Sequence, residues 1–235
     1  MTRREELSEN LREVRERVEA ACGAAGRAPG DVELLAVTKT FPASDVALLS
    51  DLGLVAFAEN RDQEASAKVL EFAELRPEAS ARWHMVGNVQ RNKARSVVSW
   101  ADRMDTVDSV RLADALAKAA GGRGGPLEVL IQVSIDGDPA RGGCPVSDVA
   151  GLAEHVARSS ELDLRGVMAV APLGMNPSDA FSVLEAVVSR LRRDHPAATV
   201  VSAGMSGDLE DAIARGSTCV RVGTALLGGR RLASP

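Results

Sequence analysis

The feature that most constrains the fold is an alternation of eight short apolar segments with stretches of helical pattern. The apolar segments cover residues 32–37, 54–58, 82–86, 103–107, 127–133, 164–170, 198–203 and 218–222. Helical patterns cover residues 43–51, 61–75, 90–99, 109–120, 146–160, 178–194 and 207–215, and a short one follows residue 224. Eight strand–helix repeats in a chain somewhat under about 250 residues predict a parallel (β/α)8 barrel, of the α/β class.

A long amphipathic helix precedes the first predicted strand. Leu7, Leu11, Val14 and Val18 recur at spacings of three and four within residues 3–25, with charged residues between them. The main alternative to a barrel is a doubly wound open sheet, which usually carries a glycine-rich dinucleotide turn, and the sequence contains none. No linker-like segment divides the chain. We therefore expect a single (β/α)8 barrel domain over residues 1–235, with an extra N-terminal helix.

The composition argues against several classes of function. The chain has 28 Lys and Arg against 33 Asp and Glu, a net charge of −5, whereas nucleic-acid binders normally carry a basic face. No apolar run reaches the roughly 18 to 20 residues of a membrane span, and the N-terminus lacks the apolar core of a signal peptide. Cys22, Cys144 and Cys219 lack the spacing of a zinc site and fit free thiols. We expect a cytoplasmic protein that binds no nucleic acid, membrane or metal.

Polar residues at the strand ends are the candidates for chemistry, because barrels of this kind work at the C-terminal ends of their strands. Lys39 follows the first strand, Asn60 follows the second, and His84 lies within the third. Lys39 has three interpretations. Its aliphatic chain could lie along apolar surface with the ammonium in water, it could form a buried ion pair, or it could form a Schiff base with a ligand. A long loop rich in glycine and charge, residues 134–145, follows the fifth strand.

The loops after the seventh and eighth strands predict a phosphate site. Ser206 lies in AGMSGD, and Gly223 and Thr224 begin a new helix. Taken alone, Ser206 fits a helix cap better than a phosphate ligand. Two helix starts beside each other favour phosphate, because their N–H groups attract anions. Arg221 precedes this site and fits an ion pair in the barrel interior about equally well.

A lysine and a phosphate site in one barrel mouth suggest a phosphorylated carbonyl ligand. Pyridoxal phosphate and a sugar-phosphate aldehyde both fit this description, because either can form a Schiff base with an amine.

Six segments resemble, in order and spacing, the pyridoxal phosphate homeostasis protein family. They are AVTKTFP, FAENRDQE, WHMVGNVQRNK, LRGVMAV, GMSGDLEDAI and VRVGTALLG. The resemblance covers nearly the whole chain, from the N-terminal helix to residue 230. It implies a barrel similar to the N-terminal domain of alanine racemase, with pyridoxal 5'-phosphate held as a reversible aldimine on Lys39.

The resemblance also implies the other residues that bind the cofactor. They are Met205, Ser206, Gly223 and Thr224 at the phosphate, Arg221 at the pyridine nitrogen, and Asn60 and His84 beside the ring. Three positions depart from the family pattern. Phe41 stands where a second basic residue is frequent, Ala58 where glycine is frequent, and Asn88 where histidine is frequent.

Family members of this kind carry and buffer the cofactor, so the resemblance implies a role in vitamin B6 homeostasis. Racemisation needs acid–base groups on both faces of the carbanion. The second base of alanine racemase is a tyrosine, and this sequence contains no tyrosine. We therefore predict a monomeric carrier, with apo-enzymes that depend on pyridoxal phosphate as recipients. The alternatives are a low-activity amino-acid racemase, a sugar-phosphate aldolase and a partner-binding module.

Overall fold

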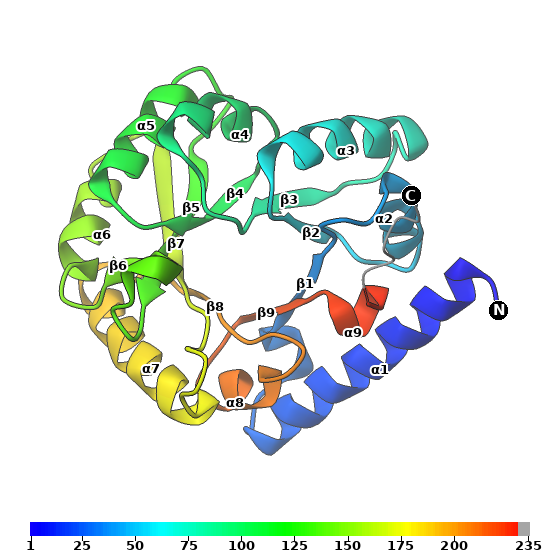
Figure 1. The fold of residues 1–235 in the computed structure, drawn as a ribbon. Helices are drawn as coiled ribbons and strands as arrows, with labels where there is room; N and C mark the ends of the chain where they lie inside the picture. The colour runs from blue at the N-terminus through cyan, green and yellow to red at the C-terminus, as the bar shows by residue number, and fades with distance from the viewer. Residues whose placement is uncertain (230–235) are drawn as a thin grey trace.

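Eight parallel strands close into a barrel in the computed structural model, which describes residues 1–229 (Figure 1). The strands are β1 (Glu33–Val37), β2 (Ala56–Glu59), β3 (Arg82–Met85), β4 (Arg103–Val107), β5 (Leu127–Ser134), β7 (Leu162–Met168), β8 (Val200–Ser202) and β9 (Cys219–Val222). They pair in chain order, and β9 closes the barrel by pairing with β1. The predicted (β/α)8 barrel is confirmed. The last six residues of the predicted domain, 230–235, lie outside the described residues.

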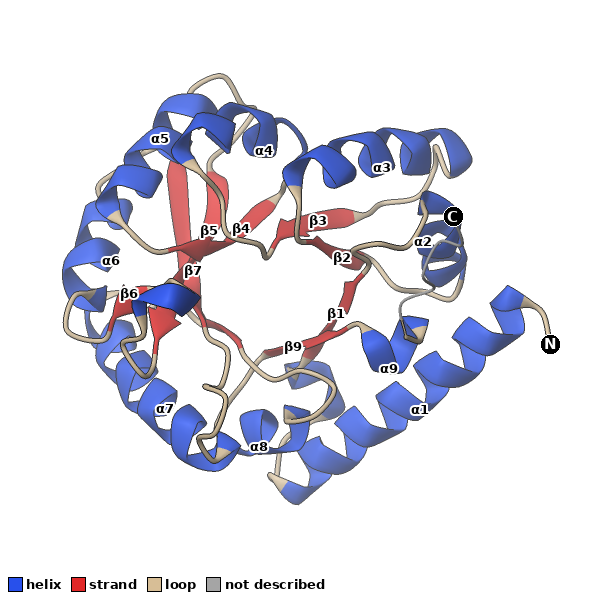
Figure 2. Cartoon of the chain, viewed as in Figure 1, coloured by secondary structure: helices blue, strands red, loops and turns tan. Residues whose placement is uncertain are grey.

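Helices surround the strands (Figure 2). They are α1 (Arg3–Ala24), α2 (Ala43–Asp51), α3 (Asp62–Leu75), α4 (Ala94–Trp100), α5 (Val110–Ala120), α6 (Val149–Ala157), α7 (Pro177–Asp194), α8 (Leu209–Ala214) and α9 (Thr224–Leu227). The pattern at 90–99 becomes a 3-10 turn, Arg91–Lys93, followed by α4. Among residues 1–229, no helix has both the length and the hydropathy of a membrane span.

One short strand lies outside the barrel and was not predicted. Strand β6 (Cys144–Pro145) pairs with the end of β5, at Val133 and Ser134. Two residues are too few to give an alternating or continuous apolar pattern. The pairing anchors the far end of the glycine-rich loop that follows β5.

Helix α1 forms as its apolar spacing predicts. Thr2 and Glu5 make a capping box at its start, in which each side chain bonds the other's backbone N–H. The side chains at the predicted spacing, Leu7, Leu11 and Val14, are buried. The helix lies along α8 and α9, outside the barrel (Figure 1).

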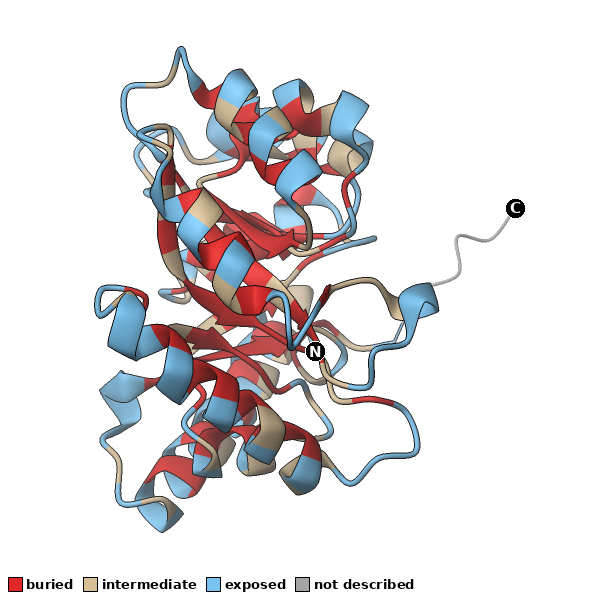
Figure 3. Ribbon diagram, turned by 90° about the vertical axis from the view of Figure 1, so that its left-hand side faces the viewer, coloured by how far each residue is buried: buried red, intermediate tan, exposed pale blue. Residues whose placement is uncertain are grey.

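Buried residues make up the barrel strands and the helix faces that cover them (Figure 3), and the barrel interior forms a cluster separate from the main core between strands and helices. Its apolar part is a small cluster that contains Leu35, Ala58 and Cys219. Side chains alternate between the two faces of a strand, so Ala58 points inward and the next residue, Glu59, points toward the helices. Charged side chains also lie in the interior, and they form part of the candidate site.

Gly166 in β7 has a backbone that only glycine adopts easily. Its φ is 151°, and a Cβ there would lie 1.9 Å from the carbonyl oxygen of Val200 on β8. We expect Gly166→Ala to lower the free energy of unfolding by about 2–4 kcal/mol, because β7 and β8 must separate to admit the methyl group. Urea unfolding measures this. Gly124→Ala is the control, since a Cβ at Gly124 meets nothing within 4 Å. Equal midpoints for the two variants would contradict the prediction.

Candidate functional site

Lys39 lies in a tight turn at the C-terminal end of β1. The turn is closed by the N–H of Phe41, which donates to the Thr38 carbonyl at 3.1 Å. Thr40 sits in the left-handed region with a φ of 68°, which for a β-branched residue costs on the order of 1–3 kcal/mol. Lys39 itself is exposed. Within residues 1–229 it makes no ion pair, so the structure does not support the buried-pair interpretation of this lysine.

The other lysines are placed less favourably for reaction with a ligand in the barrel. The chain has four: Lys39, Lys68, Lys93 and Lys118. Lys68 is only 7% exposed and pairs with Glu59 at 2.6 Å. Lys118 is exposed on the outer helix α5, and Lys93 is half-buried just before α4. Lys39 is therefore the exposed lysine that directly follows a barrel strand.

Arg221 is held rigidly in the barrel interior, beside the end of β1. It is 5% exposed, and β9 pairs with β1 so that Arg221 stands opposite Leu35. Its guanidinium donates to the carbonyl and hydroxyl oxygens of Ser202 at 2.7 and 2.8 Å, and to the Ala169 carbonyl at 2.8 Å. Burial lowers the pKa of Arg221, although a guanidinium keeps its charge in proteins. No carboxylate of the described residues forms an ion pair with it.

Close packing against α8 requires a glycine in the loop after β8. Gly204 has a φ of 90°, and a Cβ there would lie 2.6 Å from the Cβ of Ala212. Asp208 accepts from the Met205 N–H at 2.6 Å and precedes α8. Ser206 does not cap α8, which begins at Leu209. Its hydroxyl has no hydrogen-bond partner among the described residues, so the capping interpretation of Ser206 was wrong.

Gly223 and Thr224 lie at the end of β9, next to β1. A Cβ at Gly223 would lie 3.3 Å from the Val37 carbonyl oxygen. The close approach brings the start of α9 against the strand that leads to Lys39. The structure thus brings together Lys39, Arg221, Gly223 and Thr224 through the pairing of β1 with β9.

Helix α1 binds both loops of the predicted phosphate site from outside the barrel. Arg17 donates to the Ser206 carbonyl at 3.0 Å. Asn10 donates to the Leu226 carbonyl at 2.9 Å, and Arg3 donates to the Leu227 carbonyl at 3.0 Å. The last two bonds cap the C-terminal end of the four-residue helix α9.

His84 lies inside the barrel and is fully buried. Asp105 is 3.9 Å from its Nδ1, and Arg103 binds that carboxylate at 2.8 Å. Both ring nitrogens of His84 lack a hydrogen-bond partner among the described residues. An orphaned buried polar group costs free energy, which a water or ligand atom would recover.

Asn60 and two of the departures from the family pattern, Phe41 and Asn88, follow strand ends, whereas the third, Ala58, lies within β2. Asn60 is exposed and lines a pocket of about 400 Å³ with Asn88 and Lys93. The Arg3 guanidinium lies over the Phe41 ring, 5.7 Å from its centroid. A cation from α1 thus lies beside the position where family members often carry a basic residue. Ala58 is fully buried in the interior cluster.

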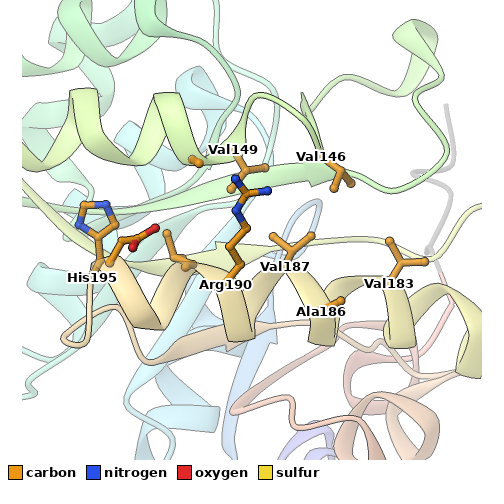
Figure 4. Close-up of a pocket in the computed structure, with 10 residues that line it drawn as sticks. Val146, Val149, Val183, Ala186, Val187, Arg190 and His195 are labelled. Carbon is orange, nitrogen blue, oxygen red and sulfur yellow. The ribbon is translucent and has the colours of Figure 1, made fainter.

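An apolar groove of about 370 Å³ lies elsewhere, between α6 and α7 (Figure 4). Val149, Val183 and Val187 line it, and the Arg190 side chain extends from α7 toward Val149. None of its lining residues follows a barrel strand at the mouth, so it is separate from the candidate site. In the described chain, no cluster of three or more His, Cys, Asp or Glu side chains could hold a metal ion.

Known proteins resemble this chain over nearly its whole length. The family described as alanine racemase, N-terminal domain, matches residues 4–231. The pyridoxal phosphate homeostasis protein of Mycobacterium leprae is 49% identical over 247 residues, which cover 99% of this chain and 96% of that protein. The chain belongs to the pyridoxal phosphate homeostasis protein family.

Solved structures agree with this family. PipY of Synechococcus elongatus, 32% identical, has been solved without and with PLP, and its TM-scores to this chain are 0.84 and 0.82. Each comparison covers 94% of this chain and 100% of that one. Alanine racemase of Corynebacterium glutamicum is 13% identical with a TM-score of 0.70, over 99% of this chain and 62% of the racemase. The racemase shares the fold, as predicted.

The sequence did not identify several side chains that support these residues. Ser202 and the Ala169 carbonyl hold Arg221, and the Glu59–Lys68 pair lies behind Thr38. Glu59 follows FA in a strand and Lys68 occupies a helix, and neither position carries a pattern that predicts contact. Their approach depends on how α3 packs on β2.

The environment of His84 predicts a pH-dependent stability. Burial lowers its pKa from 6.5 to about 3, while Asp105 opposes that shift. As pH falls below about 6.5, His84 binds a proton in the unfolded chain but stays neutral in the folded chain. The free energy of unfolding therefore decreases as the pH falls toward 3. Relative to His84→Gln, we expect the wild type to lose about 2 kcal/mol between about pH 7.5 and pH 5. Urea unfolding at each pH measures the difference, and parallel curves would refute it.

Proposed function

We propose that this chain binds pyridoxal 5'-phosphate at the barrel mouth and acts in its homeostasis as a carrier. The observation that carries the proposal is the exposed Lys39 just past the end of β1, next to the strand β9 that carries Arg221 and leads into Gly223. Two further findings support it: relatives are named for pyridoxal phosphate homeostasis, and PipY has been solved with PLP bound.

The residues present fit the chemistry of this ligand. The Lys39 amine would supply the nucleophile for the aldehyde carbon, with a C=N bond formed and one water lost, and water or another amine would reverse the attachment. The phosphate would bind at Met205, Ser206, Gly223 and Thr224, as an anion facing backbone N–H groups. Gly204 and Gly223 pack against Ala212 and Val37 too closely for an ordinary side chain, so both loops keep a bare backbone near the proposed phosphate.

Arg221, His84 and Asn60 would surround the pyridine ring. Arg221 would face the ring nitrogen, and the orphaned nitrogens of His84 support a polar neighbour in the barrel. A fixed guanidinium disfavours protonation of the ring nitrogen and so weakens the cofactor as an electron sink. The chain also has no tyrosine to act as the second base of a racemase. These two features favour a carrier over the alternative of an amino-acid racemase.

The remaining parts of the proposal concern the domain organisation, oligomeric state, cellular compartment and recipients of the carrier. We propose that residues 1–235 form one domain that works as a monomer in the cytoplasm. The three cysteines are free and buried, which suits a reducing compartment. The recipients of the cofactor would be apo-enzymes that depend on pyridoxal phosphate.

Lys39→Ala tests the covalent attachment. We expect the wild type to turn yellow with pyridoxal phosphate and, after borohydride reduction, to carry the adduct on the peptide that contains Lys39. Lys39→Ala should lose the adduct completely, because no other lysine ends a barrel strand. Lys93→Ala is the matched control, a mouth-side lysine that should leave labelling unchanged. A wild type that stays colourless, or an adduct on another lysine, would refute the proposal.

The loop after β5 is our candidate for the gate through which the cofactor leaves. Arg141 donates to the Ala171 carbonyl beyond β7 at 3.0 Å and lies 3.7 Å from Asp136. These contacts tie the loop to the neighbouring strand end. We expect Asp136→Ala with Arg141→Ala to release bound pyridoxal phosphate several-fold faster, as measured by trapping with excess amine. Glu154→Ala with Arg158→Ala removes an exposed pair on α6 as the control. Unchanged release would eliminate the gate.

A further inference from the structure

A buried ion pair lies directly behind the turn that presents Lys39. Glu59 is fully buried at the end of β2, and Lys68 reaches it from α3. The Lys68 ammonium donates to Glu59 Oε1 at 2.6 Å and to the Thr38 carbonyl at 2.8 Å. The Thr38 hydroxyl donates to the same Glu59 oxygen at 2.6 Å. The pair therefore holds Thr38 by both its backbone and its side chain.

Thr38 is the residue on which the geometry of the turn depends. Its carbonyl accepts from Lys68 and from the Phe41 N–H that closes the turn. Its own N–H donates to the Ala58 carbonyl at 3.0 Å, which continues the pairing of β1 with β2. A strained residue such as Thr40 persists only where the surrounding structure holds it in place.

The pair is costly to maintain and does not face solvent. Burial raises the pKa of Glu59, whereas Lys68 and Thr38 lower it, so the carboxylate depends on these two partners for its charge. Its Oε2 has no hydrogen-bond partner among the described residues. Buried ion pairs contribute little net stability compared with apolar packing, so stability alone is a weak reason for this one.

We propose that Glu59 and Lys68 are positioning residues that hold the Thr38–Phe41 turn, so that the Lys39 amine meets the aldehyde of its ligand. The inference rests on the proposed function of Lys39. It assigns Lys68, the one buried lysine among the described residues, a role without chemistry. The pair acts through Thr38 and touches neither the ligand nor the reacting atoms.

The experiment separates covalent capture from binding. Pyridoxine 5'-phosphate carries an alcohol in place of the aldehyde, so it reports the shape of the site without bond formation. We expect Lys68→Met to weaken the affinity for pyridoxal phosphate about tenfold, because a small displacement of a reacting group has effects of this size or larger. The affinity for pyridoxine 5'-phosphate should stay within about twofold of the wild type. The yellow absorbance at saturation should fall as well.

Matched variants define the interpretation. Lys68→Arg keeps a cation and a donor and should restore part of the pyridoxal phosphate affinity, whereas Arg76→Met removes the exposed Arg76–Asp51 pair just beyond α3 and should change neither affinity. If Lys68→Met does not fold, Thr38→Val performs the same test, because it deletes only the hydroxyl that binds Glu59.

The outcomes distinguish this inference from the proposed function. Equal losses for both ligands would mean that the pair only supports the structure, and wild-type affinities in both Lys68→Met and Thr38→Val would likewise overturn the inference. Neither result would affect the role of Lys39, which borohydride labelling of the wild type tests independently.

Discussion

The parallel pairing of β1 with β9 is the interaction on which the site depends. It joins the first and last strands of the barrel, with Ala36 opposite Val222. Residues from opposite ends of the chain thereby become neighbours, and Gly223 comes to lie against Val37, two residues before Lys39. The pairing also requires a small residue where the chain leaves β9, because a side chain at Gly223 would press on Val37. The pairing that closes the barrel is therefore also the one that places the residues of the candidate site next to one another.

Two arginines in the barrel interior, Arg103 and Arg221, are nearly fully buried, whereas Asp105 is the one fully buried carboxylate among the described residues of the interior face. The partly exposed Glu33 lies 3.8 Å from Arg103. Asp105 binds Arg103, and His84 stays uncharged because burial lowers its pKa to about 3. Arg221 is left to carbonyl and hydroxyl oxygens. A buried cation without a counter-ion is costly, and an anionic ligand at the mouth would reduce that cost.

The sequence predicts the barrel well because each strand is a separate apolar run, so the eight barrel strands are found within a few residues of their observed positions. Lys39 is found because a lysine at the end of an apolar strand is unusual. The sequence does not reveal the Glu59–Lys68 pair that lies behind Lys39. Lys68 occupies a helix and resembles any surface lysine, and its pairing with Glu59 arises only when α3 packs on the strands. Local patterns describe single elements, whereas the orientation of a reactive group depends on contacts between them.

Helix α1 shows why the barrel has a helix before its first strand. A helix of four residues such as α9 is too short to be stable alone, yet its start is part of the predicted phosphate site. Asn10 and Arg3 bind the carbonyl groups at its end, and Arg17 binds the Ser206 loop. All three donors project from one continuous helix, so the two loops keep a constant separation. The N-terminal helix therefore supports the predicted phosphate site, although it lies outside the barrel.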